Sequence, residues 1–181
     1  MRKLLITFFV FFSIGISNSY ACSCSGTSFK SAIGLSQFTS NDILVIAEIS
    51  EFYKGKYFDM EEVELVKFKI IKDYLNSSEE NYVSLVDGHE TSCIHEFRSY
   101  NYSVGDKFFI LASEYQDEEG IKGGAYVASF CVESVLKINE ETNTVKGFIK
   151  QIDYWINLFF PNYMRECTVP ELEKIIEKEI G

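Results

Sequence analysis

The stretch VELVKFKI, residues 63–70, alternates between apolar and charged side chains over most of its length. In an extended chain such a period of two puts the apolar residues on one face and the charged residues on the other. The inward set is Val66, Phe68 and Ile70, and the outward set is Lys67 and Lys69. The pattern predicts a half-buried strand from Val63 to Tyr74.

Other segments carry the same β-type signals and are separated by turn residues. Strands are predicted at 43–52, 82–86 and 107–115, with one or two more within 125–138. Turns are predicted at Asp87-Gly88, at Val104-Gly105-Asp106 and in the acidic, glycine-containing stretch 116–124. About five short strands at this spacing favour a barrel or a sandwich.

The hydrophobic period changes to a helical one after Asn143. A helix is predicted over residues 148–160, ending or bending at Pro161. A second helix is predicted to start at Thr168, because Glu171 three residues later completes a capping box. The two apolar stripes contain Phe148, Ile149, Ile152, Trp155, Ile156, Phe159 and Phe160, and then Val169, Leu172, Ile175, Ile176 and Ile180. We therefore expect a mainly β domain with two C-terminal α-helices packed on it.

The first 21 residues have the layout of a secretory signal peptide. Arg2 and Lys3 precede the apolar run Leu4–Ile16, and small residues at positions 19 and 21 precede a cleavage site after Ala21. The apolar run is short for a membrane span, which needs about 20 residues. The predicted domains are thus a signal peptide at 1–21, a β domain at 22–142 and a helical extension at 143–181. The mature protein is predicted to be secreted, or to be periplasmic or part of the cell envelope, with no integral membrane span.

The chain is acidic, and its charge limits the partners to expect. The full chain has 17 Lys and Arg against 27 Asp and Glu, a net charge of −10, and losing the two basic residues of segment 1–21 makes it −12. Such a charge opposes binding to nucleic acid or to anionic membranes. The sequence also has no Ser-His-Asp arrangement that we can place, no phosphate-binding loop and no His-Glu-x-x-His. No enzymatic activity and no cofactor are predicted.

Five cysteines in an exported chain indicate a disulfide framework. Cys22 and Cys24 are one residue apart and cannot easily bond to each other, so they are free to be attached to two different elements. We predict that Cys22 pairs with Cys93 and Cys24 with Cys131, with the exchanged pairing as the alternative. Cys167 is left over, either free or in a disulfide between chains.

These features together resemble the N-terminal domain of the tissue inhibitors of metalloproteinases. The resemblance covers about residues 22–138 and lies in the order and spacing of several features, namely Cys22-Ser23-Cys24, the stretch Asp42–Glu48, Cys93, the stretch Gly105–Leu111 and Cys131. That family belongs to the netrin-like modules, so the resemblance implies a five-stranded OB-fold barrel. The chain departs from the family in having Thr39 and Ser40 where a third bridge would be, and in lacking the family's second domain and a proline-rich run after Cys24.

The resemblance implies inhibition of a zinc metalloprotease. In the family, the amino nitrogen and carbonyl oxygen of the first cysteine chelate the protease zinc, and the next side chain enters the adjacent pocket. Here Cys22 would be the chelator and Ser23 the pocket residue. The chemistry is sound, since a catalytic zinc keeps an open position and an α-amine has a pKa of only about 7.7–8.0.

Three other interpretations remain open from the sequence. The cysteines could serve only as staples in a non-inhibitory OB-fold interaction or envelope module. Cys22 could carry a lipid anchor, which Ser19 and Tyr20 fit poorly and which would block chelation by the amine. His89, Cys93 and His95 could bind zinc or copper, although their spacing matches no standard zinc pattern.

Overall fold

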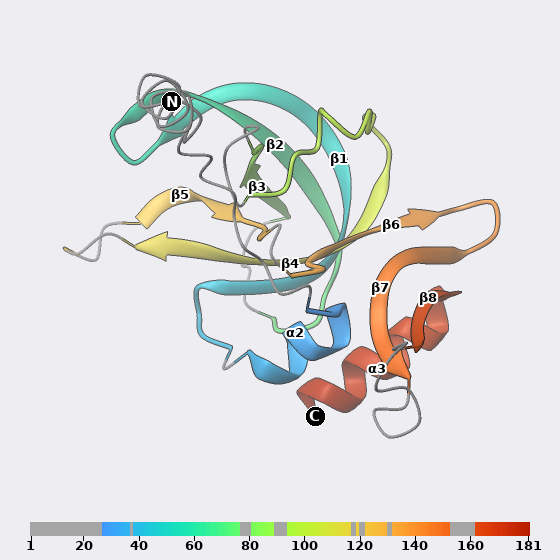
Figure 1. Cartoon of the computed structure of the whole chain (residues 1–181). Helices are drawn as coiled ribbons and strands as arrows, with labels where there is room; N and C mark the ends of the chain where they lie inside the picture. The colour runs from blue at the N-terminus through green and yellow to red at the C-terminus, as the bar shows by residue number, and fades with distance from the viewer. Residues whose placement is uncertain are drawn as a thin grey trace, which may run out of the picture.

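A computed structural model describes residues 27–36, 38–76, 81–88, 94–116, 119, 122–129, 132–152 and 162–181. The signal peptide predicted at 1–21 lies outside these residues. The described part of the chain is mainly β (Figure 1). Its elements are α2 (Phe29–Leu35), β1 (Asp42–Tyr57), β2 (Met60–Asp73), β3 (Tyr82–Val86), β4 (Lys107–Gln116), β5 (Lys122–Val127), β6 (Val135–Asn139), β7 (Thr144–Ile152), β8 (Asn162–Thr168) and α3 (Val169–Ile180).

Five of the strands pair in a closed ring. β1 pairs with β2, β2 with β3, β3 with β5, β5 with β4, and β4 again with β1. All of these pairings are antiparallel except the short contact between Leu85 of β3 and Tyr126 of β5. β1 is 16 residues long and reaches both neighbours because its first half pairs with β4 while most of its length pairs with β2.

The sheet continues beyond the ring along one side. β6 pairs with β4, β7 with β6, and β8 with β7, which completes an eight-stranded sheet. β6 and β7 form a hairpin whose turn includes Asn143 at a positive φ of 52°. In Figure 1 the strands β6, β7 and β8 lie to the right of the ring, and β8 leads directly into α3.

One apolar core, here called the ring core, fills the inside of the five-stranded ring. It contains the alternate residues Ile43, Val45, Ala47 and Ile49 of β1, which are 0% exposed. Phe68, Phe97 and Phe108 meet there edge to face, with ring centroids 5.2–6.1 Å apart. The period-two pattern of the sequence therefore corresponds to this core.

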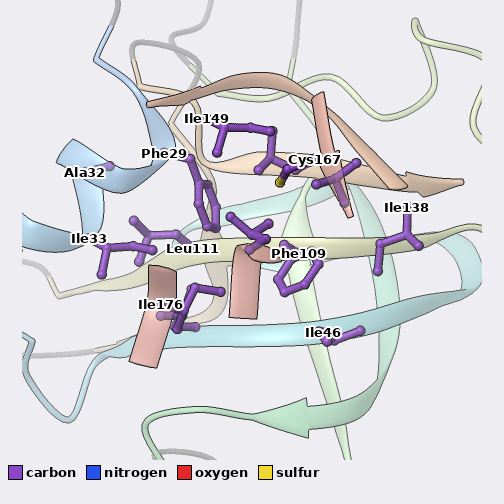
Figure 2. Close-up of a cluster of buried hydrophobic side chains, with 14 residues drawn as sticks. Phe29, Ala32, Ile33, Ile46, Phe109, Leu111, Ile138, Ile149, Cys167 and Ile176 are labelled. Carbon is purple, nitrogen blue, oxygen red and sulfur yellow. The ribbon is translucent and has the colours of Figure 1, made fainter. Parts of the chain in front are cut away.

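A second core, here called the helix-side core, lies on the outer face of β1 and β4 (Figure 2). α2 contributes Phe29 and Ile33, and α3 contributes Leu172 and Ile176. The outward residues of β1 and β4, among them Phe109, complete it. The two helices pack on each other at this end of the molecule although they are more than 130 residues apart in the chain (Figure 1).

Polar contacts hold the two helices in place. Glu173 of α3 accepts hydrogen bonds from the Lys72 ammonium (2.7 Å) and from the Tyr74 hydroxyl (2.9 Å) at the end of β2. Lys30 of α2 forms an ion pair with Glu179 of α3 (3.2 Å). Thr168 donates its backbone N–H and its hydroxyl to the Glu171 carboxylate (both 2.9 Å), which confirms the predicted capping box.

The sequence predictions are largely confirmed for the strands and partly wrong for the C-terminal segment. Strands occur at all the predicted places, and the mainly β class is confirmed. The helix predicted at 148–160 is wrong over residues 148–152, which belong to β7, and residues 153–161 lie outside the described residues. The extension 143–181 is therefore not purely helical, because it also contains β7 and β8.

Candidate functional site

Three segments that flank the predicted disulfide cysteines meet beside the ring, and we call this meeting point the junction. Thr27 forms a parallel bridge with Val132, and the Glu133 N–H donates to the Thr27 carbonyl (2.9 Å). Ile94 forms an antiparallel bridge with Ser129. The chain just before α2 thus lies beside the chain that leads into β6.

Neighbouring backbone bonds fix the third segment at the junction. The His95 N–H donates to the Ala128 carbonyl (2.9 Å), and the Gly88 N–H donates to the His95 carbonyl (3.0 Å). A Cβ at position 88 would collide with the Ile94 carbonyl oxygen, so a glycine is required at this close approach. Gly88 and Ile94, the described residues on either side of 89–93, therefore lie close together.

A buried carboxylate supports the contact between Gly88 and the segment 94–98. Asp87, 6% exposed, accepts the Phe97 N–H (2.6 Å), and Arg98 lies 3.5 Å from Asp87 and 2.7 Å from Glu64. Burial raises the pKa of the Asp87 carboxyl, while the hydrogen bonds from the Phe97 and Arg98 backbone and the Arg98 charge oppose that rise. The arrangement ties the segment 94–98 to β2 and β3.

The predicted disulfide residues themselves are not among the described residues. Cys22, Cys24, Cys93 and Cys131 lie outside the described ranges, as does Ser23, so their pairing remains a prediction. What the structure describes is the chain next to them. Ile94 follows Cys93 directly, Val132 follows Cys131 directly, and Thr27 comes three residues after Cys24.

The alternative metal set is also only partly described. His89 and Cys93 lie outside the described residues, and only His95 can be placed. Within the described part of the chain, no three His, Cys, Asp or Glu side chains are grouped so that they could hold a metal ion. The metal alternative thus stays untested.

His95 lies in a group of aromatic rings at the junction. It stacks on Tyr100, with ring centroids 5.3 Å apart and planes at 12°, and it contacts Phe97 edge to face at 4.7 Å. Its Nε2 atom is buried and has no hydrogen-bond partner among the described residues. Burial lowers the pKa of His95 to about 4, so the ring is neutral at pH 7.

Cys167 is free, and its side chain is buried in the helix-side core (Figure 2). It is 6% exposed, and burial raises the pKa of its thiol to about 11. The alternative of an interchain disulfide through Cys167 is disfavoured, because a buried, protonated thiol is a poor partner for exchange. Of the two states predicted for Cys167, the free one fits the structure.

Comparisons of the chain with protein-family models, with curated proteins and with solved structures found no match. Neither described helix has the length and apolar character that a membrane crossing requires.

Sequence reasoning missed the aromatic group around His95. Tyr100 and Tyr102 follow it in the chain. The sequence pattern that could have indicated this group is the spacing of two residues between His95 and Phe97 and again between the two tyrosines. The turn between them obscured that signal, since Asn101 has a positive φ of 55° and breaks the regular alternation.

Proposed function

We propose that the mature protein is a secreted inhibitor of a zinc metalloprotease that acts through its first residue, Cys22. In this proposal the barrel is of the OB type and the five-stranded ring is its wall. A closed ring of five mostly antiparallel strands with alternating inward residues is what such a barrel requires. The inhibitory element would be the amino nitrogen and carbonyl oxygen of Cys22, with Ser23 as the neighbouring pocket residue.

The observation that carries the proposal is the junction. Cysteines that are to be joined must reach a Cα separation of about 4.4–6.8 Å. The three residues from Thr27 back to Cys24 span at most about 11 Å, and Val132, which follows Cys131, is the bridge partner of Thr27. The pairing of Ile94 with Ser129 likewise brings the chain beside Cys93 close to that beside Cys131. These contacts support the predicted pairing and its exchange alike.

Two bridges at the junction would hold the amino terminus rigidly against the ring. An inhibitor that is already ordered loses less conformational entropy on binding. The α-amine can supply a neutral nitrogen and the Cys22 carbonyl an oxygen, and a catalytic zinc has an open position for such ligands. A free amino terminus is essential, because an acylated or extended one offers only an amide nitrogen.

The test compares three proteins on a panel of zinc metalloproteases with a fluorogenic peptide substrate. The mature protein beginning at Cys22 should inhibit at least one of them. An added alanine before Cys22 should weaken inhibition by more than about a hundredfold, since the loss of even an outer hydrogen bond to a zinc ligand can weaken zinc binding by 10–100-fold. Ser23→Gly should weaken it by about fivefold, the effect of roughly 1 kcal/mol.

The control is that all three proteins fold alike. Peptide mapping without reduction should find the same two disulfides in each, and thermal unfolding midpoints should agree. Equal inhibition by the mature and alanine-extended proteins would refute chelation by the amine. Absence of inhibition across the panel, from correctly bridged protein, would favour the non-inhibitory interaction module, and an acyl group on Cys22 in the exported protein would favour the lipid-anchored form.

A further inference from the structure

A cavity of about 330 Å³ lies next to the junction, and its lining combines aromatic rings with two lysines. Tyr100 and Tyr102 line it, together with Lys137 of β6 and Lys146 of β7. The volume is at the lower end of the range of pockets that hold small molecules, about 300–1,000 Å³. The cavity therefore suits a ligand with one or two rings.

The aromatic part of the lining is held in place within the protein. The Tyr100 and Tyr102 rings are nearly parallel, with planes at 18° and centroids 5.8 Å apart, and both stack with His95. Phe108 contacts Tyr102 edge to face at 4.8 Å. Tyr100 is 48% exposed and presents ring surface to solvent, whereas His95 contributes ring surface only, because its Nε2 atom is buried. A planar ligand can stack here with little further ordering of the protein.

The two lysines extend from neighbouring strands into the same cavity. Lys137 precedes Ile138 and Lys146 follows Val145, and Ile138 is the direct partner of Val145 in the hairpin of β6 and β7. Both lysines line the cavity, so two positive charges lie across from each other there. Like charges at opposed positions on neighbouring strands repel each other. A negative charge on a ligand beside them would reduce that repulsion.

Of the two lysines, Lys146 has the more weakly compensated charge. The Lys137 ammonium lies 2.7 Å from the Asp106 carboxylate and also lies over the Tyr102 ring at 5.2 Å. The Lys146 ammonium lies 3.6 Å from the Glu166 carboxylate, and the Lys146 side chain is 71% exposed. An ion pair so long and so exposed contributes little to stability. A ligand carboxylate can therefore replace Glu166 at small cost.

The lining also contains the carboxylate of Glu133, whose charge is compensated within the protein. Glu133 accepts the Phe148 N–H and lies in the field of the Arg165 charge, while burial raises the pKa of its carboxyl. One of its oxygens lies 2.8 Å from the Cβ position of Gly147, so the carboxylate is held against β7. The residues that line the cavity thus carry an excess of positive charge, although the whole chain has a net charge of −10.

We propose that this cavity binds a small aromatic carboxylate, whose ring stacks on Tyr100 and whose carboxylate forms an ion pair with Lys146. Such a ligand matches both the exposed ring surface and the excess of positive charge. The proposal goes beyond protease inhibition and does not depend on it, because it uses only the residues that line the cavity.

The first experiment follows two-dimensional ¹H–¹⁵N NMR spectra of the full mature protein during titration with three naphthalene derivatives at pH 7 and low salt. 2-Naphthoate is an anion, 2-naphthamide is neutral, and 2-naphthylmethylamine is a cation of similar shape. Naphthoate should bind saturably and at least about threefold more tightly than the amide, the effect of an exposed ion pair. The amine should bind most weakly, and high salt should reduce the preference for naphthoate.

This order of affinities is informative because the protein is acidic. Its overall charge favours the amine over naphthoate, so a preference for naphthoate must come from the local lysines. The shifts should centre on residues 100–102, 132–137 and 146–148. No saturable binding, shifts centred elsewhere, or equal or tighter binding of the amide would overturn the proposal.

Variants then identify the group that binds the carboxylate. Lys146→Gln should abolish most of the preference for naphthoate over the amide and leave the affinity for the amide unchanged. Glu166→Gln breaks the same ion pair but frees the lysine, so naphthoate should bind as tightly as to the wild type, or up to about twofold more tightly. Lys54→Gln makes the same change of net charge on β1, outside the residues that line the cavity, and should change nothing.

Tyr100→Ala should weaken all three probes by about threefold or more, because it removes the stacking surface. Unchanged binding of every probe to this variant would contradict the stacking contact. A preference for naphthoate that survives in Lys146→Gln, with an unchanged thermal midpoint showing that the variant is folded, would disprove the role of Lys146. Equal weakening by Lys146→Gln and Glu166→Gln would mean that the ion pair only shapes the cavity, and this too would overturn the proposal.

Discussion

At the scale of single residues, Cys167 shows how burial controls reactivity. The thiol shares the helix-side core with Ile149 of β7 and Leu172 of α3. With its pKa raised to about 11, roughly one thiol in a thousand is ionised at pH 8. The thiolate is the reactive species, so the folded environment both shields the sulfur and keeps it protonated.

We therefore expect Cys167 to resist thiol reagents in the native protein. Treatment with Ellman's reagent at pH 8 should modify it at least about a hundredfold more slowly than in guanidinium chloride, where it becomes an ordinary cysteine. Mass spectrometry of the labelled peptide assigns the signal to Cys167. Rapid labelling of this peptide in the native state, or a disulfide-linked dimer on a non-reducing gel, would contradict the buried placement.

The candidate site was predictable at this scale only in part. Chemistry-bearing residue types such as Cys22 and His95 can be recognised from the sequence. The partners of His95 could not, because Tyr100 and Tyr102 reach it only across the turn at Asn101. Such proximity is a property of the folded chain and leaves no periodic pattern in the local sequence.

At the scale of elements, β7 contains an irregularity that leaves space for the Glu133 side chain. Its pairing with β8 shifts between Lys146 and Lys150, and Gly147 in this stretch has a φ of 153°. A Cβ at position 147 would collide with the Leu136 side chain and lie 2.8 Å from a Glu133 carboxylate oxygen. The glycine thus makes room for Glu133 beside the strand.

Gly147→Ala should therefore destabilise the protein by about 2–4 kcal/mol, from backbone strain together with overpacking. Gly105→Ala is the matched control, because Gly105 also has a positive φ (94°) but no atom lies within 4 Å of its Cβ position. That variant should be destabilised by the backbone strain alone, about 1–2 kcal/mol. Urea unfolding curves measure both values. A smaller loss at Gly147 than at Gly105 would show that the neighbours of Gly147 yield easily.

The strands of the ring were predictable because they are either alternating in character, as in β2, or continuously apolar, as in the parts of β1 and β4 that are buried on both faces. The prediction for β7 failed for a physical reason. Phe148, Ile149 and Ile152 have a spacing that fits one face of a helix, and this favoured a helix. In the structure Ile149 is fully buried in the helix-side core, and β7 is held by pairing with both β6 and β8. Pairing with distant strands decided the element, and local periodicity contains no information about such partners.

At the scale of the whole molecule, His95 should give stability a clear dependence on pH. Its pKa is about 4 when folded and about 6.5 in an unfolded chain, so between these values the unfolded state binds a proton that the native state does not. Stability therefore falls as pH drops from 6.5 towards 4, by at most about 3 kcal/mol. Asp87 and Glu133, whose carboxyl pKa values are raised by burial, act in the opposite direction above the ordinary carboxyl pKa.

Comparing the wild-type protein with His95→Phe isolates this contribution. Urea unfolding at pH 7, 6, 5 and 4.5 should show a steeper loss for the wild type, and the difference between the two proteins should grow as pH falls through this window. Parallel curves over the whole range would mean that the imidazole takes up a proton equally well in the folded state.

The packing of α2 on α3 has a consequence for the order of events in folding. The helix-side core needs Phe29 from the start of the described chain and Ile176 from its last turn, and the ring closes only when β4 returns to β1. A chain that emerges with its N-terminus first can close the ring core once Val135 is free, but it cannot complete the helix-side core until Ile176 has emerged. Pairings so distant in sequence form slowly, so a chain crossing a membrane as an extended thread would lack the helix-side core until its C-terminal helix is released.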